Sequence, residues 1–458
     1  MIIDRTKERK LVEEHVQRTG PQLGLISGRR HIGKTEFLRR LCGGKAAFYH
    51  AAGMGAEQDQ LRALTSRIEQ LSSEPAIKKA TGLTWAGVLG YLFERLSRKI
   101  PLLIIDDFQN LYATRKDFPS LLASVWEEKA KGRSFCLVLS GSDMNLMRRL
   151  SGKDGALGRQ MTFYLELSAL GFAQTATLLR GYSTRDRIVS YGILGGNPGY
   201  LSQFDSRKPV EQNIRNRILD VSSFLYREPL IILTEGLREP AIYLSILKTL
   251  SQGHDRLPEI VLNSGLRDIH FVNKYLFVLK KQGVVSRVVP VTEASPETSR
   301  KGRYFFEEPY FRFWSRYVYP HRSDLEMGDV DRVWKERIKP DLDRFLQSSY
   351  QDICLENLKR LNTYNKLPFK ARRIGRWWSR GTDSLLVAMN EEGLVLFCDC
   401  LWMERMAGSR ELGRLKQNAR RFPRAKKAYY GLFSKSGFSK ELEAQSRAAE
   451  DILFFDVA

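Results

Sequence analysis

Short apolar runs alternate with amphipathic segments along the first third of the chain. Three of these runs predict buried strands: residues 21–27, 101–108 and 134–140. The segment after the first run has a helical period that places Phe37, Leu38 and Leu41 on one face. Gly43 and Gly44 then predict the end of that helix. Strands that alternate with helices are typical of an α/β fold with a parallel sheet.

The middle of the chain has helical periods and then changes to strands. Residues 160–235 predict a helical region. The next segments predict three helices and two strands, at residues 238–253, 256–266, 268–283, 284–291 and 303–308. On the third of these helices Val272, Leu276 and Leu279 share one face. Three helices followed by a β-hairpin are typical of a winged helix, whose third helix commonly enters the major groove of DNA.

Aromatic residues and then strands dominate the rest of the chain. Residues 305–320 read FFEEPYFRFWSRYVYP, and packing into a core explains such a run because aromatic side chains dominate burial. The alternative is a base-stacking platform, which requires exposed rings. Further on, the pattern predicts two strands around a turn at residues 390–393.

Net charge is the feature of the composition that changes this picture most. The chain has 458 residues, which predicts two to four domains, and 43% of them are hydrophobic, which excludes global disorder. Its 74 basic residues against 52 acidic ones give a net charge of +22, which favours a polyanionic partner such as nucleic acid. A generally basic surface is the alternative.

Membrane and zinc-binding functions find little support in the sequence. No apolar run approaches the roughly 20 residues that span a bilayer, and the first ten residues lack the apolar core of a signal peptide. A cytoplasmic protein is therefore expected. Of the five cysteines only Cys398 and Cys400 lie close together, and no second cysteine or histidine pair is nearby. Reduced, buried thiols are expected rather than a zinc site.

The segment that joins the first predicted strand to its helix carries a phosphate-binding pattern. Gly28-x-x-x-x-Gly33-Lys34-Thr35 fits G-x-x-x-x-G-K-[ST], and it stands between a strand and a helix as the chemistry requires. Glycines let backbone N–H groups turn toward phosphates, and the helix start adds its positive dipole end. Lys34 is expected to reach the β- and γ-phosphates, and Thr35 to ligate Mg²⁺.

Polar side chains follow two further predicted strands. Asp106 is expected to be the carboxylate on the metal side, and Asp107 the group that orients the attacking water. Ser140 and Ser142 follow the third strand and are candidates for sensing the γ-phosphate. For either serine, the alternative is the N-cap of a helix that begins before Met144.

At this point the motifs resemble a known family. The order IxxR, GRRxxGKT, LIIDDFQNL, LSGSDMNLM, GR and GGNPGYL is similar to the archaeal-type P-loop ATPases, which are related to the AAA+ and STAND switch ATPases. The resemblance extends through essentially the whole chain. It implies a helical lid after the ATPase core, a C-terminal winged helix, and a poorly characterised C-terminal domain.

Three further residues gain a role only through this resemblance. Arg5 matches the family's arginine beside the nucleotide, although the acid that usually follows it is Thr6 here. Gly158 and Arg159 match a Gly-Arg step whose arginine contacts the γ-phosphate, with a surface arginine as the alternative. Pro198 opens a helix of the lid near the adenine or the sugar-phosphate.

The resemblance implies ATP and Mg²⁺ as cofactors and a defined set of site residues. The residues expected to bind ATP are Arg5, Gly28, Arg29, Arg30, His31, Ile32, Gly33, Lys34, Thr35, Glu36 and Pro198. Lys34, Asp107, Arg159 and Ser140 are the catalytic candidates, and Thr35 and Asp106 the metal ligands. The family usually has Asp-Glu where this chain has Asp106-Asp107. The shorter side chain withdraws the carboxylate by about 1 Å, which can cost roughly 100-fold in rate. Firm ATP binding with slow hydrolysis is expected, as suits a switch.

Double-stranded DNA is the expected partner of the later domains. The candidate DNA contacts of the winged helix are Arg267, His270, Asn273, Lys274, Arg287, Arg300 and Lys301, and those of the tail are Arg410, Arg414, Lys416, Arg420 and Arg421. The alternative is that these are solvated faces, and that the winged helix only packs against its neighbours. The sequence leaves open whether the chain forms a homo-oligomer.

The resemblance also implies a fold like that of restriction endonucleases for the tail. Active members of that superfold carry an Asp on one strand and Glu-x-Lys on the next. Alignment of the two predicted strands puts Leu385, Asp399 and Leu401 at those positions, and Asp383 lies nearby. A leucine can neither ligate metal nor polarise phosphate, so an inactive domain is expected.

The predicted architecture is therefore an α/β P-loop core at residues 1–168, a helical lid at 169–235, a winged helix at 236–308 and an α+β restriction-endonuclease-like domain at 309–458. The leading hypothesis is a slow switch ATPase that engages DNA. An ATP-gated protein-interaction module is the alternative from a different class, and an active Mg²⁺-dependent nuclease is disfavoured.

Overall fold

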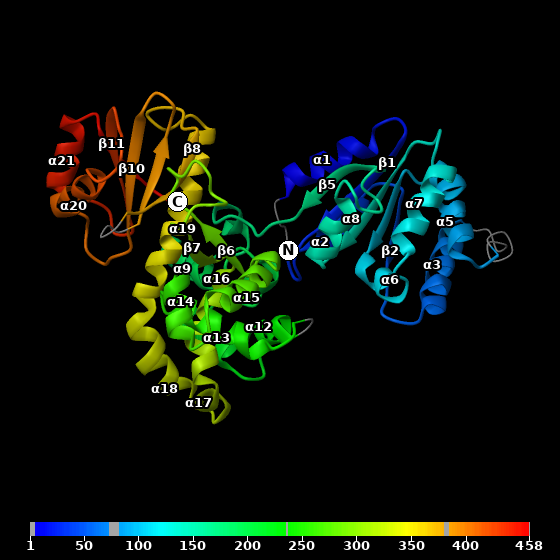
Figure 1. Cartoon of the computed structure of the whole chain (residues 1–458), viewed down its shortest axis with the longest axis horizontal. Helices are drawn as coiled ribbons and strands as arrows, with labels where there is room; N and C mark the ends of the chain where they lie inside the picture. The colour runs from blue at the N-terminus through cyan, green and yellow to red at the C-terminus, as the bar shows by residue number, and fades with distance from the viewer. Residues whose placement is uncertain (1–4, 73–81, 235–236, 380–383, 458) are drawn as a thin grey trace. The chain divides into compact units, whose positions relative to one another are not determined.

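Two compact units make up the chain, Met1–Ala169 and Leu170–Ala458. The structure is a computed structural model that describes residues 5–72, 82–234, 237–379 and 384–457 (Figure 1). Within these residues, no helix is both long and apolar enough to cross a bilayer.

A parallel sheet of five strands forms the centre of the first unit. In sheet order the strands are β2 (Ala47–Ala51), β3 (Leu102–Asp106), β4 (Phe135–Gly141), β1 (Pro21–Ser27) and β5 (Met161–Glu166). The three strands predicted from apolar runs are β1, β3 and β4, and Asp107 follows β3 rather than ending it. The prediction of helices from residue 160 onward is wrong for β5, which pairs with β1. Because β4 lies between β1 and β3, the residues after these strands meet at one edge of the sheet.

Helices cover both faces of this sheet. One face packs against α1 (Thr6–Val16) and α2 (Lys34–Cys42), and the three predicted core residues of α2 are buried there. The other face packs against α3 (Glu57–Ser72), α5 (Trp85–Glu94), α6 (Phe108–Thr114), α7 (Phe118–Lys129) and α8 (Met144–Ser151), with a 3₁₀ turn at Leu96–Arg98. A strand covered on both faces is apolar almost throughout, which explains the continuous apolar runs.

The second unit begins with helices. They are a 3₁₀ turn (Ala173–Thr177), α9 (Thr184–Leu194), α10 (Pro198–Leu201), α11 (Val210–Ile214), a π-helical turn (Arg215–Leu219) and α12 (Phe224–Thr234). Next come α13 (Pro240–Ser251), α14 (Leu257–Ser264), α15 (Ile269–Lys281) and the antiparallel strands β6 (Val285–Val288) and β7 (Arg303–Phe306). These five elements follow the order predicted from the sequence, and Val272, Leu276 and Leu279 are buried.

The aromatic run at residues 305–320 contributes to the hydrophobic core, as expected for packing and not for an exposed base-stacking platform. Tyr310, Phe313 and Trp314 have at most 1% of their surface exposed. The helices of this region are α16 (Pro309–Phe313), π-helical turns at Trp314–Val318 and Trp334–Ile338, 3₁₀ turns at Tyr319–His321 and Lys339–Asp341, α17 (Arg322–Glu326), α18 (Val330–Val333) and α19 (Leu342–Thr363).

A mixed sheet of five strands completes the second unit. In sheet order its strands are β12 (Ile452–Phe455), β11 (Lys427–Ser434), β10 (Leu394–Leu401), β9 (Leu385–Met389) and β8 (Arg373–Trp377). The first three are parallel, while β9 is antiparallel to both β10 and β8. The predicted hairpin around residues 390–393 is β9–β10, whereas β11 and β12 were not anticipated.

Two helical layers flank this second sheet. One face packs on α19, which also contacts α9, so a single hydrophobic core joins the first helices of the unit to its sheet (Figure 1). The opposite face packs on α20 (Ser409–Ala419), while α21 (Lys440–Ala448) contacts β12.

The loop between β6 and β7 is docked on this second sheet. The Val291 N–H donates to the Arg376 carbonyl on the edge strand β8 at 2.8 Å, and Arg373 donates to the Glu293 carbonyl. The Arg376 guanidinium also lies 4.8 Å from the ring of Phe305. The hairpin therefore has its loop held by the C-terminal sheet rather than extended into solvent.

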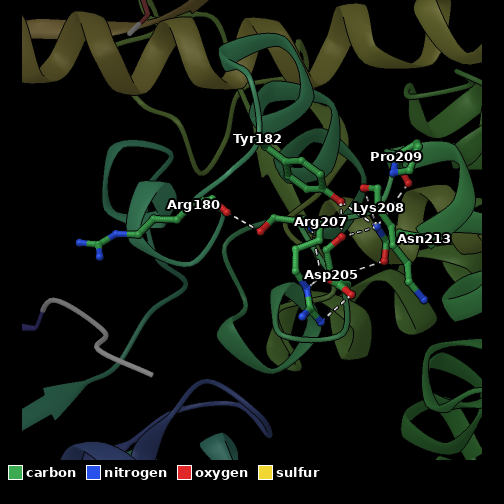
Figure 2. Close-up of polar contacts among 8 residues, drawn as sticks. Arg180, Tyr182, Asp205, Arg207, Lys208, Pro209 and Asn213 are labelled. Carbon is green, nitrogen blue, oxygen red and sulfur yellow. Dashed lines mark hydrogen bonds and ion pairs between the residues drawn. The ribbon is translucent and has the colours of Figure 1, made fainter.

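A buried asparagine closes the connection between α10 and α11. The Asn213 amide, 2% exposed, donates to the Tyr182 hydroxyl at 2.8 Å and to the Asp205 carbonyl at 2.9 Å, and accepts from the Asp205 N–H at 2.8 Å (Figure 2). Figure 2 also shows Arg207 paired with the carboxylate of Asp205. Because the Asn213 amide is buried, its own polar atoms need partners within the protein, and the half-buried Asp205 and Tyr182 supply them.

We expect Asn213→Ala to lower the free energy of unfolding by about 2 kcal/mol, because it removes the hydrogen bonds of a buried amide to the Tyr182 hydroxyl and to the backbone of Asp205. Urea unfolding followed by circular dichroism measures this change. Asn263→Ala is the matched control, because that exposed amide donates to a carbonyl of its own helix. Equal destabilisation by both substitutions would contradict the role assigned to Asn213.

Candidate functional site

The phosphate-loop segment, residues 28–33, connects β1 to α2 at the carboxyl edge of the first sheet. His31 and Gly33 both have left-handed backbone conformations, with φ of 61° and 88°. Between them Ile32 is 2% exposed and packs into the core beneath the loop. Left-handed residues alternating along a turn direct backbone N–H groups into a concave surface that suits an anion.

Lys34 begins α2 and its ammonium group is directed back into the loop. Its Nζ donates to the carbonyls of Gly28 at 2.8 Å and Arg29 at 2.9 Å, and the residue is 8% exposed. Burial lowers the pKa of Lys34 to about 8, although the negative charges of Asp106 and Asp107 act in the opposite direction. A proton on this amine is therefore held less firmly than on a surface lysine.

Asp106 ends β3 and is 1% exposed, so its charge needs partners within the protein. Its Oδ2 accepts from Thr35 Oγ1 at 3.2 Å and from the Tyr49 hydroxyl at 2.9 Å. Its Oδ1 accepts from the backbone N–H of Asp107 at 2.9 Å. The structure thus brings the two predicted metal ligands, Thr35 and Asp106, together.

Tyr49 is a site residue that the sequence reasoning missed. It lies on β2, and the pairing of β2 with β3 places it beside the end of β3. Burial and the neighbouring carboxylate of Asp106 raise the pKa of Tyr49, so the phenol keeps its proton and donates it. The polar tip of Tyr49 in a short strand was the available signal, but its partner depends on strand order.

Asp107 lies just after β3, at the start of α6, in a left-handed conformation with φ of 53°. Its carboxylate does not cap the helix; instead Oδ1 accepts from Gln109 Nε2 at 2.9 Å. Asp tolerates a left-handed backbone better than most residues do, which agrees with Asp rather than Glu at this position.

The end of β4 supplies one buried hydroxyl. Ser140 is fully buried, and its Oγ has no hydrogen-bond partner among the described residues. Strand alternation places it on the face covered by α2, with Cys136 and Val138. The N-cap of α8 is Asp143, whose side chain accepts from the Leu146 N–H, so the N-cap interpretation is wrong for both Ser140 and Ser142.

Arg5 contacts the backbone at residue Ile32 of the phosphate-loop segment. Its Nη2 donates to the carbonyl of Ile32 at 3.1 Å and to that of Ser168 at 2.8 Å, and the residue is 6% exposed. The carboxylate of Glu8 lies 3.4 Å from the Arg5 guanidinium and forms an ion pair with it. Arg5 therefore contacts the backbone of the phosphate loop, and a direct contact with a nucleotide stays a prediction.

The remaining loop residues differ in exposure. Arg30, His31 and Thr35 are exposed, and Arg29 is half-buried. Glu36 pairs with Arg40 at 2.9 Å along α2, which is a helix-stabilising role. Its predicted part in ATP binding stays untested.

Two of the predicted nucleotide contacts lie on segments other than the phosphate loop. Arg159 is exposed in the turn before β5. Pro198 begins α10 in the second unit, where Asn197 caps the helix by accepting from the Gly199 N–H. The roles of both residues in ATP binding stay predictions.

The candidate DNA contacts differ in their exposure to solvent. Arg267 and Lys274 are exposed, as are His270 and Arg300, whereas Asn273 is half-buried and accepts from the Tyr304 hydroxyl. The guanidinium of Arg287 donates to the carbonyls of Pro296 and Ser299 in its own loop. Lys301 pairs with Glu293 at 2.9 Å. In the tail Arg410, Arg420 and Arg421 are exposed, and Lys416 lies 3.9 Å from Asp451.

The second sheet shows how the positions aligned with a nuclease site are filled. Leu385 and Leu401 are buried on the face packed against α20, and Asp399 shares that face by alternation. Asp399 Oδ2 accepts from Arg414 of α20 at 2.9 Å, so the charge of this acid is paired with that of an arginine. Asp383 lies outside the described residues. Among those residues, no group of three or more His, Cys, Asp or Glu side chains that could hold a metal ion is found.

Comparisons with known proteins agree with this geometry. Residues 2–204 match a family described as an ATPase domain predominantly from Archaea, and residues 314–417 match a family of archaeal and bacterial proteins of unknown function. An uncharacterized protein of Methanocaldococcus jannaschii is 29% identical over 407 residues, which cover 88% of each chain.

Solved structures add information on the fold. The Walker-type ATPase PABY2304 of Pyrococcus abyssi superposes with a TM-score of 0.51 at 18% identity, covering 69% of this chain and 96% of that one. At this identity the likeness bears on the fold alone. The ORC2 protein of Aeropyrum pernix has a TM-score of 0.46 at 17% identity, covering 72% and 96% of the two chains, which is a distant likeness.

Both family matches fall where the sequence motifs predicted them, and the resemblance stated from those motifs is confirmed. The chain therefore carries an archaeal-type P-loop ATPase domain, matched over residues 2–204, followed by a C-terminal domain from a family of unknown function.

Proposed function

We propose that the first unit binds ATP at the phosphate loop and hydrolyses it slowly, so that the nucleotide acts as a switch. The convergence of Lys34, Thr35 and Asp106 carries this proposal. Thr35 donates to Asp106, and the buried ammonium of Lys34 is close enough for the charge of Asp106 to raise its pKa. The cation and the hydroxyl at the start of α2, with the carboxylate at the end of β3, are the groups that a nucleoside triphosphate with its metal requires.

The donor set fits Mg²⁺. Thr35 Oγ1 and Asp106 Oδ2 are hard oxygen atoms 3.2 Å apart, close enough to face one small cation. These two residues would hold the ion, which when bound neutralises charge on the β- and γ-phosphate oxygens. Tyr49 donates to the same oxygen, Asp106 Oδ2, and would help to keep the carboxylate in place.

The residues of this chain divide the work of hydrolysis. A bond forms between a water oxygen and the γ-phosphorus while the bond to the β,γ-bridging oxygen breaks, and that electron pair leaves with ADP. The proton of the water passes to the released phosphate. Lys34 stabilises negative charge on the phosphates, and Asp107 orients the water. The short side chain of Asp107 limits the rate.

Nucleotide binding should weaken at alkaline pH, because the free protein loses the Lys34 proton as pH rises through its pKa of about 8. We expect the Kd of a fluorescent ADP analogue to rise roughly tenfold between pH 7.5 and 9, because the ammonium fraction falls by about that factor. Fluorescence titration without Mg²⁺ measures this, so that no metal charge alters the titration.

Lys34→Arg is the control, since an arginine stays charged over this range and should remove the pH dependence. Lys34→Ala should abolish most binding at every pH. Tight uptake of nucleotide by Lys34→Ala would contradict the proposed site.

Asp107→Glu should raise the turnover of ATP, on the order of tenfold or more, because the longer side chain moves the carboxylate toward the water. Asp107→Asn should lower the turnover while leaving nucleotide affinity unchanged. Phosphate release under saturating ATP measures both variants. A rate for Asp107→Glu below that of the wild type would show that the shorter acid does not limit hydrolysis.

We further propose that the second unit engages double-stranded DNA. The observation that favours this is a basic segment, residues 420–427, that follows α20. It contains Arg420, Arg421, Arg424, Lys426 and Lys427, all of them exposed. A second candidate surface contains Arg267, just before α15, and Lys274, on α15. Arg287 is a weaker candidate, because the carbonyls of its own loop occupy its guanidinium.

The triple substitution of Arg420, Arg421 and Arg424 by Gln should weaken duplex binding and reduce its salt dependence by about one unit of slope for each phosphate that the protein no longer neutralises. Fluorescence anisotropy at two or more salt concentrations measures both quantities. The control replaces Lys335, Arg337 and Lys339 by Gln, which removes the same charge from another exposed surface. Equal reductions of affinity in both triple variants would indicate a net-charge effect, and an unaltered affinity would exclude this surface.

A further inference from the structure

The side-chain amide of Gln109 joins the ends of two neighbouring strands. Gln109 lies in the first turn of α6, directly after Asp107 and Phe108. Its Nε2 donates to Asp107 Oδ1 at 2.9 Å, and its Oε1 accepts from the backbone N–H of Ser142 at 3.1 Å. The residue after β3 and the residue after β4 are thus linked through one amide, although they are far apart in the sequence.

The chemistry of its two partners sets the direction of this amide. The Ser142 N–H can only donate, so it requires the oxygen of Gln109. The carboxylate of Asp107 can only accept while it is ionised, so it requires the NH₂ group. A flipped amide would place donor against donor and acceptor against acceptor, so only one orientation satisfies both contacts.

The surroundings leave this amide little freedom. A Cβ added at Gly141 would lie 2.8 Å from Gln109 Oε1 and 2.8 Å from the sulfur of Met147, so the amide of Gln109 packs closely over the backbone of Gly141, and a larger residue there would displace it. The backbone of Asp107 is held in a left-handed turn, and its carboxylate does not cap α6. The carboxylate is therefore held by Gln109, and Gln109 is held by the backbone after β4.

We propose that Gln109 is a positioning residue for ATP hydrolysis, which fixes Asp107 by reference to the end of β4. The inference rests on the proposed ATPase function and adds to it the group that orients the acid. With Oδ1 engaged by Gln109, the second oxygen of Asp107 remains to orient the water. The amide of Gln109 transmits any displacement of the turn at Gly141 and Ser142 to Asp107. A shift at the end of β4, near the proposed γ-phosphate contact of Ser140, therefore also moves the acid that orients the water.

Two substitutions separate the two contacts of Gln109. Gln109→Met keeps the length of the side chain but removes both hydrogen bonds. Gln109→Glu keeps an oxygen for the Ser142 N–H but removes the donor to Asp107 and adds a like charge. If the donor to Asp107 matters, both variants should lower kcat on the order of tenfold. KM for ATP and Kd for ADP should stay within about twofold, because the phosphate loop is unaltered.

The matched control is Asn110→Leu, which removes the neighbouring amide of the same helix, whose Nδ2 donates to the Ala52 carbonyl. Its kcat should match that of the wild type. Phosphate release at saturating and limiting ATP, ADP binding and thermal melting are measured for all four proteins.

Several outcomes would overturn the inference. They are an unchanged kcat in Gln109→Met, retention of kcat by Gln109→Glu alone, or a fall in kcat that is accompanied by equal falls in affinity and melting temperature. The second of these would show that only the hydrogen bond with Ser142 matters, and the third would indicate a structural role. A wild-type protein that binds but never hydrolyses ATP would instead refute the proposed hydrolysis itself.

Discussion

The buried negative charge of Asp106 is the constraint around which the first unit is organised. A carboxylate with 1% of its surface exposed is stable only if the protein supplies donors. Here these come from three separate segments: the hydroxyl of Thr35 on α2, the phenol of Tyr49 on β2 and the backbone N–H of Asp107. The start of the P-loop helix, the edge strand and the turn after β3 are consequently held in mutual register by one side chain.

Local patterns predicted much of this fold, and long-range pairing accounts for what they missed. The runs at β1, β3 and β4 are apolar because both faces of each strand are covered, so their position was evident from the residues alone. The contact of Tyr49 with Asp106 depends on β2 being the neighbour of β3, and that of Gln109 with Ser142 on β4 being the next strand. Neither neighbour relation can be derived from a local period.

The second unit shows the same division between local and distant information. The three helices and hairpin of residues 238–308 follow from helical and strand periods, but the attachment of their loop to β8 does not. The guanidinium of Arg287 looked available in the sequence because its carbonyl partners lie in a loop with no pattern. The sequence pattern did not predict β11, which follows a basic segment, or β12, which has only four residues.

The docked loop between β6 and β7 also protects the second sheet from other copies of the protein. An unpaired border strand exposes a row of backbone donors and acceptors that can recruit foreign strands and start aggregation. Strand β8 is such a border, and the Val291 N–H already satisfies one of its carbonyls, that of Arg376. Shortening this loop would therefore compromise solubility at high concentration, even if every helix around it folded normally.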